Sequence, residues 1–489
     1  MINKFLNLFL ISILLTLTNS KLSFVFSAYR HGARYTQKNY YDGKDQPHGK
    51  LSPTGIRQHY ELGQIIRKKY IEDLKFLNET YNFDEIYTFS TDVDRTIQSA
   101  NSQLMGMYPF KTGQDIYHNV DKEYLIPPYE GIQYENLGDE ALPDLYVPPI
   151  IHNTNTESNI IMYPQCNNII SKLIKFATKP ATLLQAKNFI SWSKPTLQYT
   201  RELFNDTSLQ IYDLPYIQDV LVCDMYNGRT LPYGFSPDSV YWKNLTYFVS
   251  YISYFAQQDT EVLDIVNSGV MNLLIQNFDS VVKKTNGKYK WTMLSAHDSN
   301  LSNYLPAFNL TSSKCLKQIY ETGKTKSLNC NDSPPFAANL FIELYENDEN
   351  TNQNENYNDY YVKIQYDGEY QYMCEKKQTQ CNYAEFRERI LYHSYTDQER
   401  DEICNNNKQN QQTQSQEYQE IAEHLQKGEW KDFFKIFYNN HQQLLDQDIE
   451  NYEVNPVLNK KINNNNLKRN QEIIYEINDD FQQLFEITI

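Results

Sequence analysis

Two arginines flank a histidine in the segment Arg30-His31-Gly32-Ala33-Arg34, and this grouping could carry out phosphoryl chemistry. Guanidinium groups bind phosphate oxygens through a planar fork of donors that a lysine ammonium cannot reproduce. A histidine held between two arginines should have a lowered pKa, because a nearby positive charge disfavours the imidazolium. His31 would then stay a neutral nucleophile well below neutral pH, while Gly32 lets the backbone approach a ligand closely. Taken alone, the five residues could also be a surface cluster in a loop.

Three residues elsewhere in the chain supply what the first segment lacks. Arg95 offers a third guanidinium, His297 offers a donor to a phosphate oxygen, and Asp298 offers a proton for a leaving group. Phosphoryl transfer depends mostly on charge neutralisation and positioning, with a general acid for a poor alkoxide leaving group. Singly, Arg95 could be a surface ion-pair partner and His297-Asp298 could be structural. Together the three segments indicate a phosphate site.

The elements that must position these residues are three strand–loop–helix units. Residues 21–29, 85–90 and 289–294 read as strands, and each ends just before one of the charged segments. Ser52-Pro53 predicts a helix start, since a capping hydroxyl precedes a proline at the first helical position. Ile56, Tyr60, Gly63 and Ile66 would form the apolar side of that helix. Ligands of open α/β sheets bind at the carboxyl ends of strands, where helix N-termini also favour anions.

The chain is therefore expected to be an α/β protein with an inserted, mainly helical cap domain. The remaining strands of the sheet are predicted at residues 340–345 and 360–366. We expect a catalytic core over 21–110 and 260–404, the cap over 111–259, and an Asn/Gln-rich, partly helical extension over 405–489.

The composition of the chain excludes some classes of function. The chain has 489 residues with 45 basic and 61 acidic side chains, a formal net charge of −16. Such an acidic chain is a poor nucleic-acid binder, because phosphate backbones are held by an excess of Lys and Arg. No segment is long enough to predict a stable membrane span. A homodimer is left open.

The first 20 residues predict a signal peptide and hence a secreted or lysosomal protein. Lys4 precedes an apolar stretch from Phe5 to Leu17, and small residues up to Ser20 offer a cleavage site. Glycosylation sequons fit this route; they lie at Asn78, Asn205, Asn244 and Asn309, with less favourable ones at Asn300 and Asn331.

Seven cysteines suit an oxidising compartment, and the odd number leaves at least one unpaired within the chain. Cys374 and Cys381 are close enough in sequence to close a small loop. Neither a C-x2-C pair nor an H-E-x-x-H helix motif is present, so no zinc site and no other metal is predicted.

The segment Arg30–Arg34 resembles the signature of the histidine acid phosphatases, and further matches follow in that family's order. Gly49–Gly55 with Gln58, Ser90–Thr96, Ser295–Asp298 and Pro334–Ala337 are each similar to a family block. The resemblance spans about residues 21–405.

The resemblance implies a mixed central sheet with helices on both faces, a helical cap and no cofactor. It implies that His31 is the nucleophile and forms a phosphohistidine, and that Asp298 donates the proton. Arg30, Arg34, Arg95 and His297 would hold the phosphate. It also implies the disulfides Cys166–Cys404 and Cys374–Cys381, whereas the pairing of Cys223, Cys315 and Cys330 stays open, because Asn339 stands near the position where relatives have a cysteine.

The leading hypothesis is an acid phosphatase that hydrolyses phosphate monoesters through a phosphohistidine. A phytase-like phosphatase is the runner-up. A polyphosphorylated substrate favours a basic entrance, whereas residues 111–259 contain 10 basic and 16 acidic side chains. An inactive relative that only binds phosphorylated ligands is disfavoured, because His31, His297 and Asp298 are all present.

Overall fold

A computed structural model describes residues 20–37, 48–128, 138–153, 179–232, 235–255, 259–285, 289–323, 326–347, 356–374 and 377–405, with isolated residues between 169 and 176 and between 434 and 442. The expected signal peptide, apart from Ser20, and nearly all of the 405–489 extension lie outside these residues. Among the described residues, no helix combines the length and apolarity that a membrane crossing needs.

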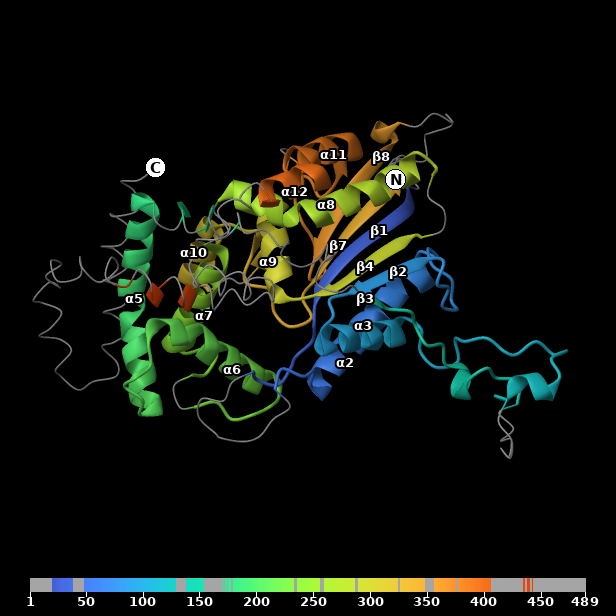
Figure 1. Ribbon diagram of the computed structural model, residues 1–489, viewed down its shortest axis with the longest axis horizontal. Helices are drawn as coiled ribbons and strands as arrows, with labels where there is room; N and C mark the ends of the chain where they lie inside the picture. Colours follow the sequence, from blue (N-terminus) through green and yellow to red (C-terminus); the bar gives the residue numbers. More distant parts are fainter. Residues whose placement is uncertain are drawn as a thin grey trace, which may run out of the picture.

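The core is a mixed sheet in the order β10-β8-β7-β1-β4-β2-β3, with β9 paired to β8 (Figure 1). Strands β1 (Lys21–Arg30), β4 (Trp291–Ala296), β2 (Ile86–Ser90) and β3 (His152–Asn153) are parallel. Strand β7 (Asn339–Glu346) runs antiparallel to β1 and to β8 (Tyr360–Tyr366). The short strands β9 (Glu369–Tyr370) and β10 (Cys381–Asn382) complete that side. The predicted α/β class is thus confirmed.

Alternate side chains of β1 face two different layers of helices. Phe24, Phe26 and Ala28 pack against α8 (Thr260–Val282), α9 (Asp298–Ala307) and α11 (Tyr383–Tyr392). Val25 and Tyr29 pack on the other face against α2 (Pro53–Ile66), α3 (Asp94–Met107) and η1 (Arg67–Asp73). The near-continuous apolar run of this strand follows from burial on both faces.

Two of the predicted elements differ from the structure in detail. Strand β4 extends to Ala296, two residues beyond the predicted end, so it delivers His297 directly to the sheet edge. Helix α2 begins after the Ser52 cap as predicted, but it buries Gly55, His59, Gly63 and Ile66, whereas Ile56 is 45% exposed. The prediction was right for Gly63 and Ile66 and wrong for Ile56. The helices touch through small residues, since a Cβ on Gly63 would lie 2.1 Å from the Gln103 carbonyl oxygen of α3.

Helices α5 (Pro180–Phe204), α6 (Leu214–Tyr226) and α7 (Val240–Phe255) form a second apolar cluster beside the sheet (Figure 1). Helix α10 (Ser313–Thr322) joins them, since Tyr320 stacks on Tyr247 of α7. In the chain between α3 and α5, the described part of 111–153 contains the short helices η2 (Lys122–Leu125) and η3 (Pro143–Leu145) and returns to the sheet as β3. Further short elements are η5 (Ile211–Asp213), β5 (Lys326–Ser327), β6 (Cys330–Asn331), η7 (Tyr357–Asp359) and α12 (Asp397–Asn405).

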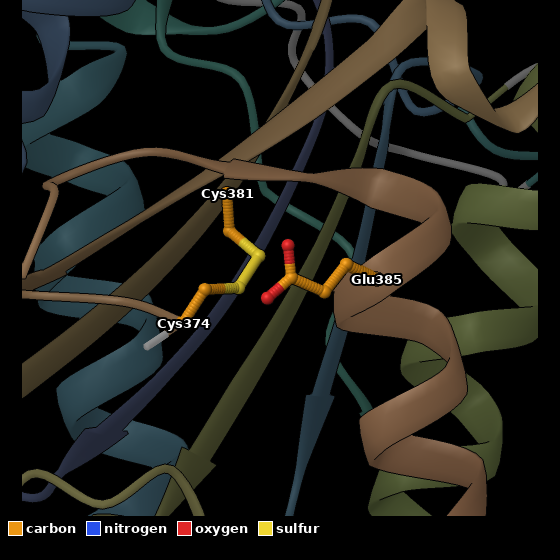
Figure 2. A group of neighbouring side chains, drawn as sticks. All are labelled: Cys374, Cys381 and Glu385. Carbon is orange, nitrogen blue, oxygen red and sulfur yellow. A yellow bond between two sulfur atoms is a disulfide. The ribbon is translucent and has the colours of Figure 1, made fainter. Parts of the chain in front are cut away.

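The disulfide Cys374–Cys381 is present as predicted, and Cys315 pairs with Cys330. Cys223 is buried and forms no disulfide with another described cysteine. Cys404 is disulfide-bonded, and its expected partner Cys166 lies outside the described residues, so that pairing stays a prediction. Figure 2 shows the Glu385 carboxylate facing the Cys374–Cys381 bridge. Because both thiols of this trio are consumed by the bridge, the trio offers no thiolate for a metal.

Candidate active site

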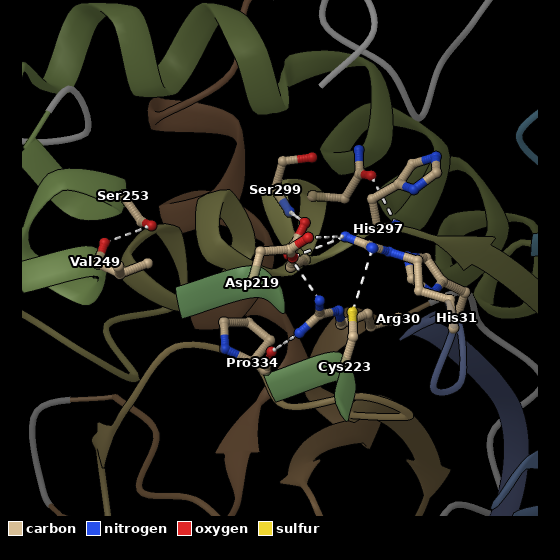
Figure 3. A network of polar contacts seen from close by, with 12 residues as sticks. Arg30, His31, Asp219, Cys223, Val249, Ser253, His297, Ser299 and Pro334 are labelled. Atoms are coloured by element: carbon tan, nitrogen blue, oxygen red, sulfur yellow. Dashed lines mark hydrogen bonds and ion pairs between the residues drawn. The ribbon is translucent and has the colours of Figure 1, made fainter. Parts of the chain in front are cut away.

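The carboxyl ends of β1, β4 and β2 bring the three charged segments together. The His31 amide donates to the Ala296 carbonyl at 3.0 Å, and the Thr91 amide donates to the Ser295 carbonyl at 3.2 Å. The rings of His31 and His297 lie edge to face with their centroids 5.6 Å apart (Figure 3). Residues separated by more than 260 positions thus share one buried site.

His31 is 2% exposed, and its ring orientation is set by its own loop. Nδ1 lies 2.8 Å from the Gly32 carbonyl oxygen, which can only accept, so Nδ1 carries the proton and Nε2 keeps its lone pair. Burial first, then the charges of Arg95 and Arg30, hold the pKa of His31 well below its usual value of 6.5. A neutral imidazole with a free Nε2 electron pair is the form that can attack phosphorus.

The loop that carries His31 is packed too tightly for side chains at two glycines. A Cβ on Gly32 would lie 2.4 Å from the Gly55 carbonyl oxygen, and one on Gly55 would lie 2.1 Å from the Ala33 carbonyl oxygen. The Gly32 amide donates to Ser99 Oγ at 3.1 Å, and the Ala33 amide donates to Gln58 Oε1 at 2.8 Å. Helices α2 and α3 therefore fix the backbone around the histidine.

Arg30 is anchored on the side of β7. It donates to the Pro334 carbonyl at 2.7 Å, pairs with the Asp298 carboxylate at 2.9 Å, and lies with Cζ 4.2 Å from the centre of the Phe336 ring. Stacking on an aromatic face orients a guanidinium without consuming its donors.

Arg34 is held from the cap. Its Nη2 lies 2.8 and 3.0 Å from the two carboxylate oxygens of Asp219 on α6, and its Nη1 lies 3.4 Å from Cys223 Sγ (Figure 3). Burial alone would lower the pKa of Arg34, but the Asp219 carboxylate beside it raises it above its usual value.

Arg95 stands on the first turn of α3, with Nη2 3.4 Å from His297 Nδ1. Burial and the charge of Arg34 lower its pKa to about 10, so it remains a cation at physiological pH. The buried Nε–H groups of Arg30, Arg34 and Arg95 have no acceptor in the described protein. Unsatisfied buried donors are rare, and three cationic ones around a histidine are a donor set for an anion.

His297 and Asp298 begin α9. Burial and the charge of Arg95 lower the pKa of His297 to about 3, and the His297 amide donates to Asn300 Oδ1 at 3.1 Å. Asn300 and Asn331 are each 3% exposed, which removes both as glycosylation sites. The Asp298 side chain is 34% exposed, so it is more accessible to solvent than its partner Arg30, which is 9% exposed.

All six site residues proposed from the sequence thus lie together at the carboxyl ends of β1, β4 and β2. The sequence analysis missed Asp219, Cys223 and Phe336, which contact the arginines, and Thr91, which contacts His297. Phe336 and Thr91 belong to motifs noted in the sequence, so both could have been considered as candidate site residues. Asp219 and Cys223 stand on a cap helix with no motif to mark them.

A buried histidine among three arginines at the edge of a mixed α/β sheet is an arrangement that suits a phosphatase. Residues 43–367 match the histidine phosphatase superfamily, branch 2, and the chain belongs to that family. The match begins downstream of the Arg30–Arg34 segment.

Individual relatives agree with this assignment. The chain is 25% identical to lysosomal acid phosphatase of Xenopus laevis, over 67% of each chain. It is 28% identical to human prostatic acid phosphatase, over 59% of this chain and 70% of that one. Among solved structures, the phytase from Citrobacter braakii superimposes with a TM-score of 0.50 at 14% identity, over 77% of this chain and 98% of that one, and shows the same fold. The chain is accordingly a phosphoric monoester hydrolase of the acid phosphatase type.

Proposed function

We propose that this enzyme hydrolyses phosphate monoesters by double displacement at His31. Nε2 of His31 attacks phosphorus, the ester P–O bond breaks, and Asp298 protonates the departing alkoxide. Water then attacks phosphorus and gives a proton to the Asp298 carboxylate, the P–N bond breaks, and its electron pair returns to His31 as inorganic phosphate leaves. Arg30, Arg34 and Arg95 bind the phosphate oxygens, with His297 beside Arg95 as the fourth member of the phosphate-binding set.

One observation carries this proposal: His31 is neutral, buried and protonated at Nδ1, and three guanidiniums surround it. The cations neutralise charge on the transferring phosphoryl group without a metal ion. They also prevent His31 from becoming protonated in acid, so the nucleophile keeps its lone pair at the pH of an acidic compartment.

The proposal is tested by quenching the enzyme rapidly during turnover without acid, because acid would release the phosphate from histidine. Wild-type enzyme should carry phosphate that is stable in alkali and released by acid, as expected of a phosphohistidine. His31→Ala should carry none and should show no turnover. Full activity in His31→Ala would refute the mechanism, and His393→Ala serves as a control for loss of a histidine outside the site, since His393 pairs with Asp264 of α8.

The substrate proposed is a simple monoester rather than a polyphosphorylated one. The cap segment carries a net negative charge, and Asp219 adds a carboxylate at the pocket itself. The structural neighbour from Citrobacter braakii is a phytase, which keeps phytate as the second candidate substrate. We expect kcat/KM to be higher for an aryl phosphate than for phytate, and the reverse order would favour the phytase.

We further propose that the enzyme is secreted or lysosomal and that residues 1–20 direct it there. The apolar N-terminal stretch, the disulfides and the names of the acid phosphatase relatives support this location. N-terminal sequencing of the mature protein tests the cleavage. The homodimer stays a prediction, which sedimentation analysis of the purified enzyme tests.

A further inference from the structure

One stripe of α2 faces the backbone that carries the nucleophile, and His59 lies at the centre of this stripe. Gly55, His59 and Gly63 are spaced four residues apart, so they share one face of the helix. The two glycines bring α2 into backbone contact with Ala33 at one end of the stripe and with α3 at the other. His59 stands between these two contacts, and it is 0% exposed.

The backbone of Arg30 and His31 is held from two sides. On the side of β7, the Arg30 amide donates to the Ala338 carbonyl at 2.9 Å, and the His31 carbonyl accepts from the Ala337 amide at 3.2 Å. On the side of α2, the Arg30 carbonyl lies 3.0 Å from Nε2 of His59. A buried backbone carbonyl without a partner is costly, and here a side chain supplies the partner at the point where β1 ends.

The Arg30 carbonyl decides which nitrogen of His59 carries a proton. A carbonyl oxygen can only accept, so Nε2 is protonated in this contact. Burial lowers the pKa of His59 to about 4, so above that pH the ring is neutral and Nδ1 keeps a lone pair. The Gln103 amide lies at Nδ1, with Oε1 at 3.2 Å and with a buried Nε2 that has no acceptor among the described residues. Because half a turn of an amide exchanges its oxygen and its nitrogen, Gln103 can donate to the neutral ring or accept from the protonated one, and Nε2 of His59 donates to Arg30 in either state.

We propose that His59 is a positioning residue for phosphoryl transfer: its Nε2–H group holds the Arg30 carbonyl and thereby fixes the peptide group that joins Arg30 to His31. This peptide group connects a phosphate-binding guanidinium to the nucleophile, so its displacement would move both relative to the phosphorus atom. Small misplacements of reacting groups cost large factors in rate. The inference deepens the proposed function and rests on it for the roles of Arg30 and His31.

The first test compares His59→Leu, which removes both ring nitrogens, with His59→Gln, whose Nε2 can take the place of the imidazole Nε2. Loss of one buried hydrogen bond corresponds to about a 3- to 10-fold change. We therefore expect His59→Leu to form phosphohistidine in a single turnover about 3- to 10-fold more slowly than wild type, and His59→Gln to restore most of that rate. Equal losses in the two variants, or no loss in His59→Leu, would overturn the proposal.

Asn272→Leu is the matched control, because it also removes a side-chain donor from a backbone carbonyl. Nδ2 of Asn272 on α8 donates to the Tyr395 carbonyl at 2.8 Å. Helix α8 packs on the face of the sheet opposite to α2. This control should be less stable than wild type in denaturant unfolding, yet it should form phosphohistidine at the wild-type rate. An equal slowing in Asn272→Leu and His59→Leu would overturn the proposal, because it would trace the effect to a general loss of stability.

The second test examines the hydrogen bond itself in wild-type enzyme, so it does not depend on the folding of His59→Leu. Nitrogen-15 NMR of histidine-labelled protein distinguishes the two neutral tautomers, and the spectrum of His59→Gln identifies the His59 signal. At neutral pH we expect a neutral ring with its proton on Nε2, and a proton on Nδ1 would overturn the proposal. Trapped phosphohistidine with an unchanged rate in His59→Leu would refute the role of His59 alone. An Nε2–H ring in an enzyme that traps no phosphohistidine would instead refute the mechanism proposed for His31.

Discussion

The ion pair between Arg34 and Asp219 joins the phosphate site to the cap, and Asp219→Asn tests what it does. The two side chains are 6% and 12% exposed and lie 2.8 Å apart. Asparagine keeps the size and one acceptor oxygen but removes the negative charge. Arg34 then stays buried beside the cations of Arg30 and Arg95 with less counter-charge.

The size of the effect follows from the burial of the pair. Removing one partner of a buried ion pair costs about 3–5 kcal/mol of stability, and we expect about 3 kcal/mol here because asparagine still accepts one hydrogen bond. Phosphate supplies the missing negative charge when it binds. If bound phosphate restores about 1.4 kcal/mol of the stability that Asp219→Asn loses, the variant binds phosphate about tenfold more tightly than wild type does.

Denaturant unfolding with and without inorganic phosphate measures both quantities. We expect Asp219→Asn to be less stable than wild type without phosphate and to gain about 1.4 kcal/mol more than wild type at the same saturating phosphate concentration. The control is Asp279→Asn, which breaks the ion pair with Arg387 at 2.9 Å between α8 and α11, away from the site. This control should lose stability but gain no more from phosphate than wild type does. An equal phosphate increment in Asp219→Asn and wild type would refute the reasoning.

Three further predictions concern the acid, a buried histidine and a helix contact. Asp298→Asn should lower kcat for an alkyl phosphate by about 10²- to 10⁴-fold, because a poor leaving group needs a general acid. The same variant should lower kcat far less for an aryl phosphate, which has a good leaving group. Equal losses of kcat on the two substrates in steady-state kinetics would contradict the role of Asp298 as the acid. Burial lowers the pKa of His59 from 6.5 to about 4, so the unfolded chain binds that proton at a higher pH than the folded protein does. Stability should fall as pH drops from 6.5 to 4, and His59→Gln should remove about 3 kcal/mol of that fall, as unfolding curves at the two pH values would show. If the stability of His59→Gln fell with pH as much as that of wild type, His59 would not be the source of the fall. Gly63→Ala should cost about 1–3 kcal/mol of stability, because the new Cβ would overlap the Gln103 carbonyl oxygen, whereas Ala at the exposed neighbour Gln64 should leave the unfolding midpoint almost unchanged.

The strands that present the catalytic groups could be predicted because they are short apolar runs that end in charged segments. The residues of β1, β2 and β4 are buried on both faces of the sheet, so their sequences contain few polar positions. Ser52-Pro53 likewise specifies the start of α2 locally, through the serine cap and the proline ring. These features depend only on residues that are neighbours in the sequence, so one sequence is enough to predict them.

Contacts made by small or distant residues could not be predicted in the same way. The buried side of α2 is set by Gly55, His59 and Gly63, which carry little hydrophobic signal, and it exists because α3 approaches to backbone contact. The contact between His297 and Thr91 joins residues that are 206 positions apart, which only coordinates reveal. Asp219 is one of many acidic residues in the cap, and its pairing with Arg34 is a tertiary contact across 185 positions.

The Asp219 contact changes how the proposed chemistry should be understood, because it makes α6 part of the electrostatics of the site. Burial, together with the three guanidiniums around it, lowers the pKa of His31. Burial, and then repulsion from Arg34, likewise lowers the pKa of Arg95. Asp298 offsets the charge of Arg30 from the core, and Asp219 offsets that of Arg34 from α6. A phosphate dianion adds further negative charge to this cluster, so the pocket must be cationic enough to bind it and not so cationic that the product is retained. Since Asp219 sets that balance from outside the sheet, substitutions on α6 should shift phosphate affinity and product release without touching the nucleophile.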